Sequence, residues 1–600
     1  METRTHPPET LPAIVRRALA QPQDAVLLGR VAGAWAATSS EQLLRRVSNL
    51  ACAIRDAGLS TGDRVALIAQ NSVDWIVADF ATLFAGCVVV PIFSTQALDQ
   101  VRYILGNSEA KLIFVDTLEA ERRLRTMEAP LPRIVVFEGE GSGCLAAFES
   151  HGAEIRVQHP ELPDAFEAAL QPDDLAVLIY TSGTTGQPKG VMLSHDNLGS
   201  NAQGAFDYGL GGVERGAPVL SVLPLSHIYE HCMLYGYMIK GVSVYVCHNP
   251  DDMLADLRDA HPVVVTAVPR IFERVINGIK SSAKAHGGAQ AKLVPWALDT
   301  GRDYMLAKVQ GPRPGAALSL RYRLAWELVL RKIRPALGLD KLLFFVSGSA
   351  PLHLDTAMTM LACDITILEG YGLTECSPVV TASRLEDHRY GTVGKALPGV
   401  QIKIAEDGEI LTKGPNVMKG YYKDPEATAA VFEDGWFETG DIGAVDADGY
   451  VRITDRKREL FKTSGGKFVA PARVESAIKR SVYVNQVLLV GYGRPHPAAL
   501  VLPNWDLLRR DFHLSAAMAT SEIAAREDVQ RLITEEVRRT TSDLASYEQV
   551  RRVVVLPRDL TVERGELSPT LKVRRRVVED NYATEIERVY RLDLHESPHA

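Results

Sequence analysis

The 600-residue sequence has few cysteines and no long run of apolar residues. Its seven cysteines are scattered without a Cys-x-x-Cys pair, which argues against a structural zinc site or a disulfide framework and suits a reducing cytosol. No window approaches the roughly 20 apolar residues that a membrane-spanning helix requires. The first residues, METRTHPPETLPAIVRR, carry charges throughout and lack the apolar core of a signal peptide. We therefore expect a soluble protein, in which peripheral membrane contact would need only a small apolar or basic patch.

An excess of basic charge is also lacking. The net charge of −8 is mild for this length and predicts no nucleic-acid partner. A hydrophobic content of 46% is ordinary for a globular protein, and 600 residues exceed what one hydrophobic core normally serves. We see no internal repeat. The sequence therefore predicts two or more globular domains.

The order of apolar runs predicts an α/β fold over roughly the first 400 residues. Residues 64–70 and 88–93 resemble buried strands on either side of a helix over 72–86, an alternation typical of parallel strands joined by crossovers. From residue 391 short strands with Gly/Asp turns predict a small β subdomain. Residues 504–546 are highly charged, and we expect a solvated two-helix excursion there. Further apolar runs of the strand type lie at 110–115, 133–137, 175–180, 241–247 and 262–268.

The most informative segment is YTSGTTGQPKG, residues 180–190. Its glycines allow a tight turn that points backbone N–H groups at an anion, and its hydroxyls and Lys189 supply further donors to phosphate oxygens. Lys189 follows Gly186 by three residues, which excludes a Walker loop with its Gly-x4-Gly-Lys-Ser/Thr spacing. A flexible Ser/Gly linker would not need the lysine. The candidate phosphate-binding residues are Thr181, Ser182, Gly183, Thr184, Thr185, Gly186 and Lys189.

Two later segments are candidates for a nucleotide pocket. In LEGYGLTEC (368–376), glycines on both sides of Tyr371 let the backbone approach a flat ligand, and the ring can stack on a purine. The carboxylate of Glu375 could hold Mg²⁺ beside a triphosphate. The segment SGSAPL (347–352) follows an apolar run and consists of small residues. It could contribute to the pocket or be an ordinary turn between a strand and a helix. The candidate residues are Ser349, Ala350, Glu369, Gly370, Tyr371, Gly372, Thr374 and Glu375.

A third candidate site lies further along the chain, in GWFETGD (435–441). The carboxylate of Asp441 can accept two hydrogen bonds from a vicinal diol, although TGD by itself is a common turn. Taken in this order with TDRKRELFKTSGGKFVAP (454–471) and GELSPTLKVRRR (565–576), the segments resemble the acyl-adenylate-forming (AMP-binding) superfamily. The SGG loop and the TLKVRR ending are similar to its long-chain fatty acid–CoA ligase (acyl-CoA synthetase) branch.

The resemblance implies an enzyme that activates a long-chain fatty acid with ATP to acyl-AMP and transfers the acyl group to CoA. Mg²⁺ is its implied cofactor, and Glu375 with Thr184 would be the protein ligands of the metal. The adenine pocket would be lined by 368–376, and the ribose would contact Asp441 and Arg456. Lys572 would enter the site during adenylation, as a catalytic residue.

The resemblance further implies a large N-terminal domain (1–455), in which 390–455 form the small β subdomain, and a mobile C-terminal α+β domain (456–600). The hinge would be 456–458, where Arg458 replaces the usual Asp or Lys of the family. A rotation about it would bring Gly465 and Gly466 to line the CoA channel.

A histidine follows the phosphate loop in PLSHIYEH (224–231). The family has a histidine near the place where the acyl carbonyl meets phosphate, and His227 rather than His231 stands in that position. A helix-cap or core histidine is the alternative role for His227.

Several alternatives stay open at this stage. A fatty-acyl-AMP ligase would load a carrier-protein thiol with the same adenylation residues, and an aryl or medium-chain acyl-CoA ligase would differ in its pocket. A non-catalytic nucleotide-binding scaffold would not need Lys572, Glu375, Asp441 and Lys189 together. We expect a cytoplasmic protein. The sequence does not determine the preferred acyl chain length, whether the protein forms a homodimer, or whether it contacts the inner face of the membrane.

Overall fold

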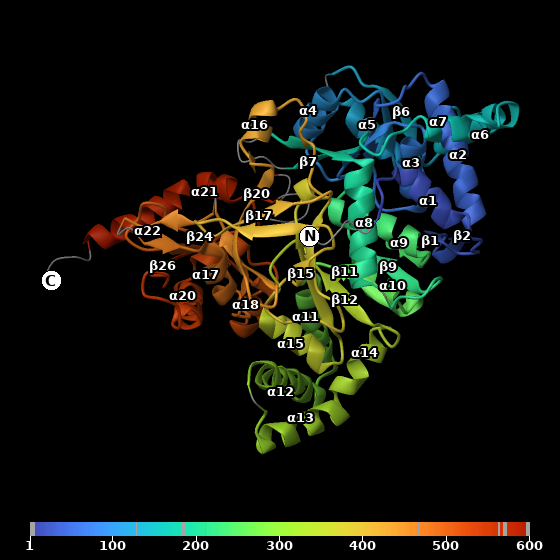
Figure 1. Ribbon diagram of the computed structural model, residues 1–600. Coiled ribbons are helices and arrows are strands. Elements are labelled where there is room, and N and C mark those ends of the chain that lie inside the picture. Colours follow the sequence, from blue (N-terminus) through green and yellow to red (C-terminus); the bar gives the residue numbers. More distant parts are fainter. Residues whose placement is uncertain are drawn as a thin grey trace. The chain divides into compact units, whose positions relative to one another are not determined.

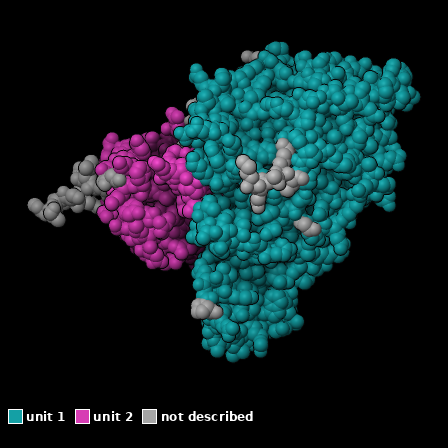
Figure 2. Space-filling model, in the orientation of Figure 1, with its two compact units in different colours: residues 1–403, 411–439, 445–452 teal, residues 404–410, 440–444, 453–600 magenta. Residues whose placement is uncertain are grey.

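The computed structural model describes residues 6–127, 129–181, 187–210, 212–311, 313–457, 459–464, 467–561, 564–567 and 573–595. The chain forms two compact units, shown in different colours in Figure 2. Unit 1 comprises residues 1–403, 411–439 and 445–452, and unit 2 comprises residues 404–410, 440–444 and 453–600. Each unit is described by itself below.

The larger sheet of unit 1 has nine strands and is parallel at its centre (Figure 1). Its strands are β1 (Leu27–Val31), β2 (Ala34–Thr38), β9 (Pro218–Ser221), β10 (Ser243–Val246), β11 (Val264–Ala267), β12 (Phe344–Ser347), β13 (Ile367–Gly372), β14 (Val379–Ala382) and β15 (Lys395–Ala396). The parallel order is β13-β12-β11-β9-β10-β1, and antiparallel strands extend both edges. All four residues of β11 are buried, as expected for a parallel strand with both faces covered.

The second sheet of unit 1 has seven strands in the order β18-β8-β7-β4-β3-β5-β6. They are β3 (Arg64–Ile68), β4 (Val88–Ile92), β5 (Leu112–Val115), β6 (Arg133–Val136), β7 (Leu175–Thr181), β8 (Lys189–Ser194) and β18 (Gly420–Tyr421). Strands β3 to β7 pair in parallel, whereas β8 and β18 add antiparallel strands at one edge. The predicted α/β fold with parallel strands is therefore confirmed.

Helices cover the two sheets because their apolar faces match the buried strand residues. One core cluster packs Leu220, Val265 and Phe345 of the nine-stranded sheet against α11, α12 and α15. Local sequence fixes the helix starts: the Ser39 and Gln42 side chains form a capping box on α2, and Ser194 and Asn197 form one on α8. The seven cysteines are buried and free.

The helices of unit 1 are α1 (Leu11–Leu19), α2 (Ser40–Asp56), α3 (Val73–Phe84), α4 (Leu98–Ser108), α5 (Leu118–Arg125), α6 (Leu145–Gln158), α7 (Leu162–Ala168), α8 (His195–Gly209), α9 (Ile228–Lys240), α10 (Met253–Ala260), α11 (Pro269–His286), α12 (Gln290–Gln310), α13 (Ala316–Leu328), α14 (Ile333–Ala336), α15 (Leu354–Ala362) and α16 (Pro425–Ala429). Three short 3₁₀ helices join them: η1 (Pro250–Asp252), η2 (Leu330–Lys332) and η3 (Thr374–Cys376).

A five-stranded sheet corresponds to the predicted small β subdomain. It contains β16 (Gln401–Ile404), β17 (Glu409–Lys413), β19 (Phe432–Glu433), β20 (Trp436–Val445) and β21 (Val451–Arg456). The division of the chain into two units falls within four of these strands.

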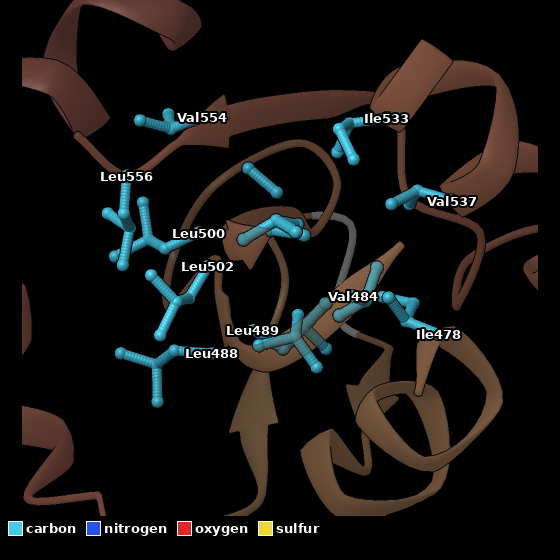
Figure 3. Packing of buried hydrophobic residues seen from close by; sticks show 14 of the residues in the cluster. Ile478, Val484, Leu488, Leu489, Leu500, Leu502, Ile533, Val537, Val554 and Leu556 are labelled. Atoms are coloured by element: carbon cyan, nitrogen blue, oxygen red, sulfur yellow. The ribbon is translucent and has the colours of Figure 1, made fainter. Parts of the chain in front are cut away.

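Unit 2 has its own hydrophobic core around a three-stranded sheet. The sheet consists of β24 (Val484–Val490), β25 (Ala498–Pro503) and β26 (Arg552–Val555), and the pair β22 (Phe461–Lys462) and β23 (Phe468–Val469) precedes it. Figure 3 shows Leu488, Leu500 and Val554 of the three strands in this core. The helices are α17 (Pro471–Ile478), α18 (Trp505–Asp511), α19 (Thr520–Ala525), α20 (Glu527–Thr541), α21 (Arg575–Asn581) and α22 (Ala583–His595).

The expectation of a solvated two-helix excursion at 504–546 is wrong. The segment forms three helices, α18 to α20, and their apolar residues belong to the core of unit 2. In α20, Val529, Ile533 and Val537 are fully buried at i, i+4 and i+8 (the last two are labelled in Figure 3). A narrow apolar stripe within a highly charged composition is sufficient to fix a helix on a sheet.

Candidate functional site

The strands on either side of the predicted phosphate loop pair with each other in unit 1. Strands β7 and β8 are antiparallel neighbours, and Thr181 of β7 pairs with Lys189 of β8 at the base of the loop. Five of the predicted residues, Ser182, Gly183, Thr184, Thr185 and Gly186, lie outside the described residues. Strand β7 runs parallel to β4, so Thr181 lies at the carboxyl end of a parallel strand, the usual place for a ligand in an α/β sheet.

A tyrosine that the sequence did not single out connects Lys189 to Glu375. The Tyr421 hydroxyl donates a hydrogen bond of 2.9 Å to Oε1 of Glu375. Nζ of Lys189 lies 5.0 Å from the centroid of the Tyr421 ring, within the range of a cation–π contact. Tyr421 is held there because β18 pairs with β8 and its backbone N–H donates to Oγ1 of Thr428, 2.9 Å away. We call Lys189, Glu375 and Tyr421 the charged cluster.

The charged cluster fits a magnesium–phosphate ligand. Mg²⁺ is usually bound by one or two carboxylates together with phosphates and water, so it needs no large cage of side chains. The part of the chain that the structure describes holds no group of three or more His, Cys, Asp or Glu side chains suited to a metal. Glu375 is half-buried on η3, and its backbone oxygen accepts a bond of 2.8 Å from the Met418 N–H, which fixes the segment. Its carboxylate supplies a hard oxygen ligand, and the ammonium of Lys189, which contacts the ring of the same Tyr421, can pair with phosphate oxygens.

The predicted adenine segment lies at the carboxyl edge of the nine-stranded sheet. Strands β12 and β13 are parallel, with Ser347 opposite Glu369, so the turn at Ser349 and Ala350 leaves the sheet beside Glu369 to Gly372. Ser349 has a φ of 67°, a left-handed conformation that forms the tight turn. Burial raises the pKa of Glu369 to about 7, despite a hydrogen bond from the Leu352 backbone. A carboxyl with this pKa is partly neutral at physiological pH and repels a phosphate less.

The glycines around Tyr371 are required first by the protein's own packing. A Cβ at Gly372 would lie 1.8 Å from the Pro378 carbonyl oxygen, and one at Gly370 would lie 3.2 Å from that of Thr381. Both contacts come from β14 and the turn that precedes it, so the close approach of backbone occurs without a ligand. Tyr371 itself is 8% exposed, which leaves only a small part of its ring for a stacked purine. Thr374 begins η3, directly before Glu375.

His227 stands at the first turn of α9, where it is half-buried. Its Nδ1 accepts a hydrogen bond of 3.2 Å from the Tyr229 N–H, which makes it the helix cap. An accepting Nδ1 places the proton of the neutral ring on Nε2, and an N–H at that position can donate to a carboxylate or phosphate oxygen. The Tyr229 hydroxyl donates to the Val346 carbonyl at 3.2 Å, so the first turn of α9, which His227 caps, is linked to β12, the strand that precedes the turn at Ser349.

His231, one helical turn further along α9, belongs to the core of unit 1. Its Nε2 lies 2.9 Å from Oδ1 of Asp79 and 2.7 Å from the Tyr235 hydroxyl, and all three side chains are fully buried. A ring enclosed in this way has no access to substrate, and His227 remains the predicted site histidine.

A buried carboxyl next to His227 and Tyr229 was also missed by the sequence analysis. Glu230 is 0% exposed, and its two oxygens accept hydrogen bonds from the Ser221 hydroxyl (2.5 Å) and the Thr266 hydroxyl (2.6 Å). Burial raises the pKa of Glu230 to about 7, although both hydroxyls act in the opposite direction. Ser221 is the last residue of β9 and Thr266 lies in β11. Glu230 therefore links the first turn of α9 to two parallel strands.

Replacing Glu230 by Gln is expected to stabilise the protein at alkaline pH relative to the wild type. The folded-state pKa is raised, so the contribution of Glu230 to stability is complete below about pH 4.5 and is lost as the pH rises through about 7. Gln resembles the neutral acid and does not ionise. The advantage of the variant should therefore grow by up to about 3 kcal/mol between pH 5 and pH 8.

Urea denaturation of the wild type and the Glu230→Gln variant at both pH values measures this change. The exposed Glu119 on α5 provides a matched control. The Glu119→Gln variant should change the urea midpoint by the same amount at pH 5 and at pH 8. A Glu230→Gln difference that does not depend on pH would contradict the buried, raised-pKa carboxyl.

Asp441 and Arg456 come together within unit 2. Nε of Arg456 lies 3.3 Å from Oδ1 of Asp441, with the arginine side chain 60% exposed and the aspartate 8% exposed. Glu409 fixes the strand beside them, because its Oε1 accepts a hydrogen bond of 2.7 Å from the Gly440 N–H. An acceptor and a donor side by side can bind the two hydroxyls of a ribose.

The remaining predicted residues, Arg458, Gly465, Gly466 and Lys572, lie outside the described residues. The structure does describe the basic residues that follow Lys572. Arg575 donates to the Leu489 carbonyl (2.7 Å) and to Glu475 (2.8 Å), which gives it a structural role in unit 2. Arg576 is exposed.

The sequence matches the family model of the AMP-binding enzymes over residues 15–422 and that of the AMP-binding enzyme C-terminal domain over residues 459–593. This chain belongs to the AMP-binding enzyme family. The resemblance predicted from the motifs is thereby confirmed, and the protein is an acyl-adenylate-forming enzyme of an ATP- and AMP-binding family.

The relatives of this AMP-binding enzyme extend over nearly its full length. It is 34% identical over 564 residues to the long-chain-fatty-acid–CoA ligase FadD15 of Mycobacterium bovis, with 93% of each chain covered. The adenylation domain of a carboxylate reductase from Mycobacterium chelonae has a TM-score of 0.75 at 25% identity, covering 98% of this chain and 92% of that domain. ATP-bound MatB from Rhodopseudomonas palustris has a TM-score of 0.67 at 25% identity, covering 95% and 99%. No helix among the described residues is long and apolar enough to span a membrane.

Proposed function

We propose that this enzyme is a long-chain fatty acid–CoA ligase that forms acyl-CoA, AMP and pyrophosphate by way of an acyl-adenylate. The observation that carries the proposal is the charged cluster, in which Lys189 and Glu375 both contact Tyr421. The choice of acid and acceptor is supported by the similarity to FadD15.

The first half-reaction joins an anion to a polyanion. A carboxylate oxygen of the acid bonds to the α-phosphorus of ATP, and the bond to the bridging oxygen breaks, so that pyrophosphate leaves. Lys189 would hold the departing phosphates, and the Nε2–H of His227 would orient the carboxylate. When bound at Glu375 and Thr184, Mg²⁺ supplies positive charge to the phosphate oxygens. Asp441 and Arg456 would bind the ribose, and Lys572 would stabilise charge at the α-phosphorus.

The second half-reaction transfers the acyl group to a thiol. The sulfur of CoA bonds to the acyl carbon, the bond from that carbon to the AMP oxygen breaks, and the thiol proton passes to solvent. We propose that the C-terminal domain (456–600) rotates about 456–458 between the two steps and brings Gly465 and Gly466 to the pantetheine channel. The enzyme would act in the cytoplasm. That it forms a homodimer and that it contacts the inner face of the membrane stay predictions.

A second acceptor is the alternative to CoA. The fold is also similar to a carboxylate reductase adenylation domain over almost the whole chain, which does not single out CoA, and the alternative second step is transfer to the thiol of a carrier protein.

A substrate panel tests the proposal. Purified protein is incubated with Mg·ATP and fatty acids from C6 to C20, or benzoate, and pyrophosphate and AMP are followed with and without CoA. AMP release that requires CoA and is fastest with long chains is the expected result. Pyrophosphate release that stops after one turnover even with CoA would assign another acceptor, and a benzoate optimum would assign an aryl-CoA ligase.

A further inference from the structure

Helix α13 carries an exposed apolar stripe. Leu320, Leu324 and Leu328 are 61%, 50% and 49% exposed, and their spacing of four residues places them on one side of the helix. Val309, near the end of the neighbouring helix α12, is 41% exposed. Among the residues that the structure describes, no other helix bears three large apolar side chains with this exposure.

The opposite side of α13 is fixed to unit 1. Tyr322 stacks on Tyr304 of α12 with ring centroids 4.1 Å apart and an interplanar angle of 1°, and Ala325 is fully buried. Figure 1 shows α12 and α13 side by side, at the end of unit 1 that is remote from α4 and α5. The leucines are therefore presented outward on an anchored helix.

The apolar stripe lies in a segment with an excess of basic residues. Residues 313–334 contain six Lys or Arg and a single acidic residue, Glu327, within a chain of net charge −8. Glu327 is itself paired with Arg331 at 3.2 Å. Five of the basic residues are exposed: Arg313, Arg321, Arg323, Arg331 and Lys332. A surface that combines exposed leucines with arginine and lysine side chains can bind the interface of an anionic bilayer through apolar burial and attraction to the headgroups.

We propose that α13 docks unit 1 on an anionic membrane surface. The leucines would enter the boundary of the acyl chains, while the basic side chains extend to the phosphate headgroups. A second copy of the chain fits this surface less well, because a symmetric contact would bring two positively charged faces together. Docking does not depend on the proposed reaction, but it would give that reaction access to acids dissolved in a bilayer.

Vesicle flotation tests the proposal with the full-length protein. Binding is measured to phosphatidylcholine vesicles and to vesicles with 30% phosphatidylglycerol, at low and at high NaCl concentration. The wild type is expected to bind the anionic vesicles. Its binding should be at least about 10-fold weaker at high salt than at low salt, since exposed charges are screened. The variant with Leu320→Ser, Leu324→Ser and Leu328→Ser is expected to lose binding by about 10-fold or more.

Two matched controls separate this surface from general effects of charge and apolarity. Val31→Ser, Leu118→Ser and Val157→Ser together remove three exposed apolar side chains elsewhere in unit 1 and should leave binding unchanged. Arg321→Glu with Arg323→Glu should abolish binding, whereas Arg102→Glu with Arg122→Glu, on the exposed sides of α4 and α5, should not.

The proposal is overturned if the wild type does not bind anionic vesicles, or if the serine variant binds as well as the wild type. It is also overturned if the wild type is a dimer and the serine variant a monomer, because the stripe would then join two copies. AMP release from decanoate without vesicles serves as the independent readout. Equal rates in wild type and serine variant are expected and show intact folding, while a loss of AMP release in both would speak against the proposed function and not against docking.

Discussion

Replacing Glu375 by Gln is expected to lower the rate of pyrophosphate release by about 10²–10³-fold, the usual effect of removing one preorganised charge from a transition state. Gln has nearly the same size and can still accept the hydrogen bond from the Tyr421 hydroxyl, so the packing around η3 should persist. The negative charge that would hold Mg²⁺ is lost. The Mg²⁺ concentration needed for half-maximal rate should therefore rise in the variant.

Initial rates over a range of Mg²⁺ concentrations measure both effects. Glu426→Gln, an exposed glutamate on α16, is the matched control and should retain the wild-type rate and Mg²⁺ dependence. If Glu375→Gln kept its Mg²⁺ dependence while losing activity, the carboxylate would serve the fold and not the metal.

Replacing Lys572 by Ala is expected to abolish formation of the adenylate and to spare the second half-reaction. The resemblance places this ammonium next to the α-phosphorus only during adenylation, where its loss should cost about 10²–10³-fold. Acyl-AMP supplied from outside should still react with CoA at nearly the wild-type rate. Pyrophosphate release and thioester formation are measured separately for each variant.

The neighbouring arginines provide the controls for Lys572. Arg576 is exposed and Arg576→Ala should leave both half-reactions unchanged. Arg575 is unsuitable, because it holds Leu489 and Glu475 in unit 2 and its removal would weaken the unit itself. Equal loss of both half-reactions in Lys572→Ala would contradict the assigned role.

The parallel strands of unit 1 could be predicted because buried strands are continuous apolar runs. The run at 64–70 became β3 and that at 262–268 became β11, with differences of a few residues at the ends. The small β subdomain was marked by its Gly/Asp turns. The helices at 504–546 were misjudged because the dense charge of α20 concealed the stripe Val529, Ile533 and Val537, and only the tertiary structure shows what that stripe covers.

Part of the candidate site could not be predicted from motifs. Tyr421 is 46 residues from Glu375 and more than 200 from Lys189, and it meets them only because β18 pairs with β8. Glu230 was visible within PLSHIYEH, but its partners Ser221 and Thr266 come from strands whose pairing the sequence did not specify. The roles proposed for Lys189, Glu375 and Asp441, in contrast, are predicted from short local segments, where chemistry and spacing coincide.

The most direct test of acyl-adenylate formation follows the oxygen atoms of the acid. Palmitate labelled with ¹⁸O in its carboxylate is incubated with the enzyme, Mg·ATP and CoA, and the products are analysed by mass spectrometry. Attack of the carboxylate on the α-phosphorus predicts one ¹⁸O in AMP and none in pyrophosphate, because the C–O bond to AMP breaks in the second step. Label in pyrophosphate or phosphate, or AMP without label, would contradict the adenylate mechanism.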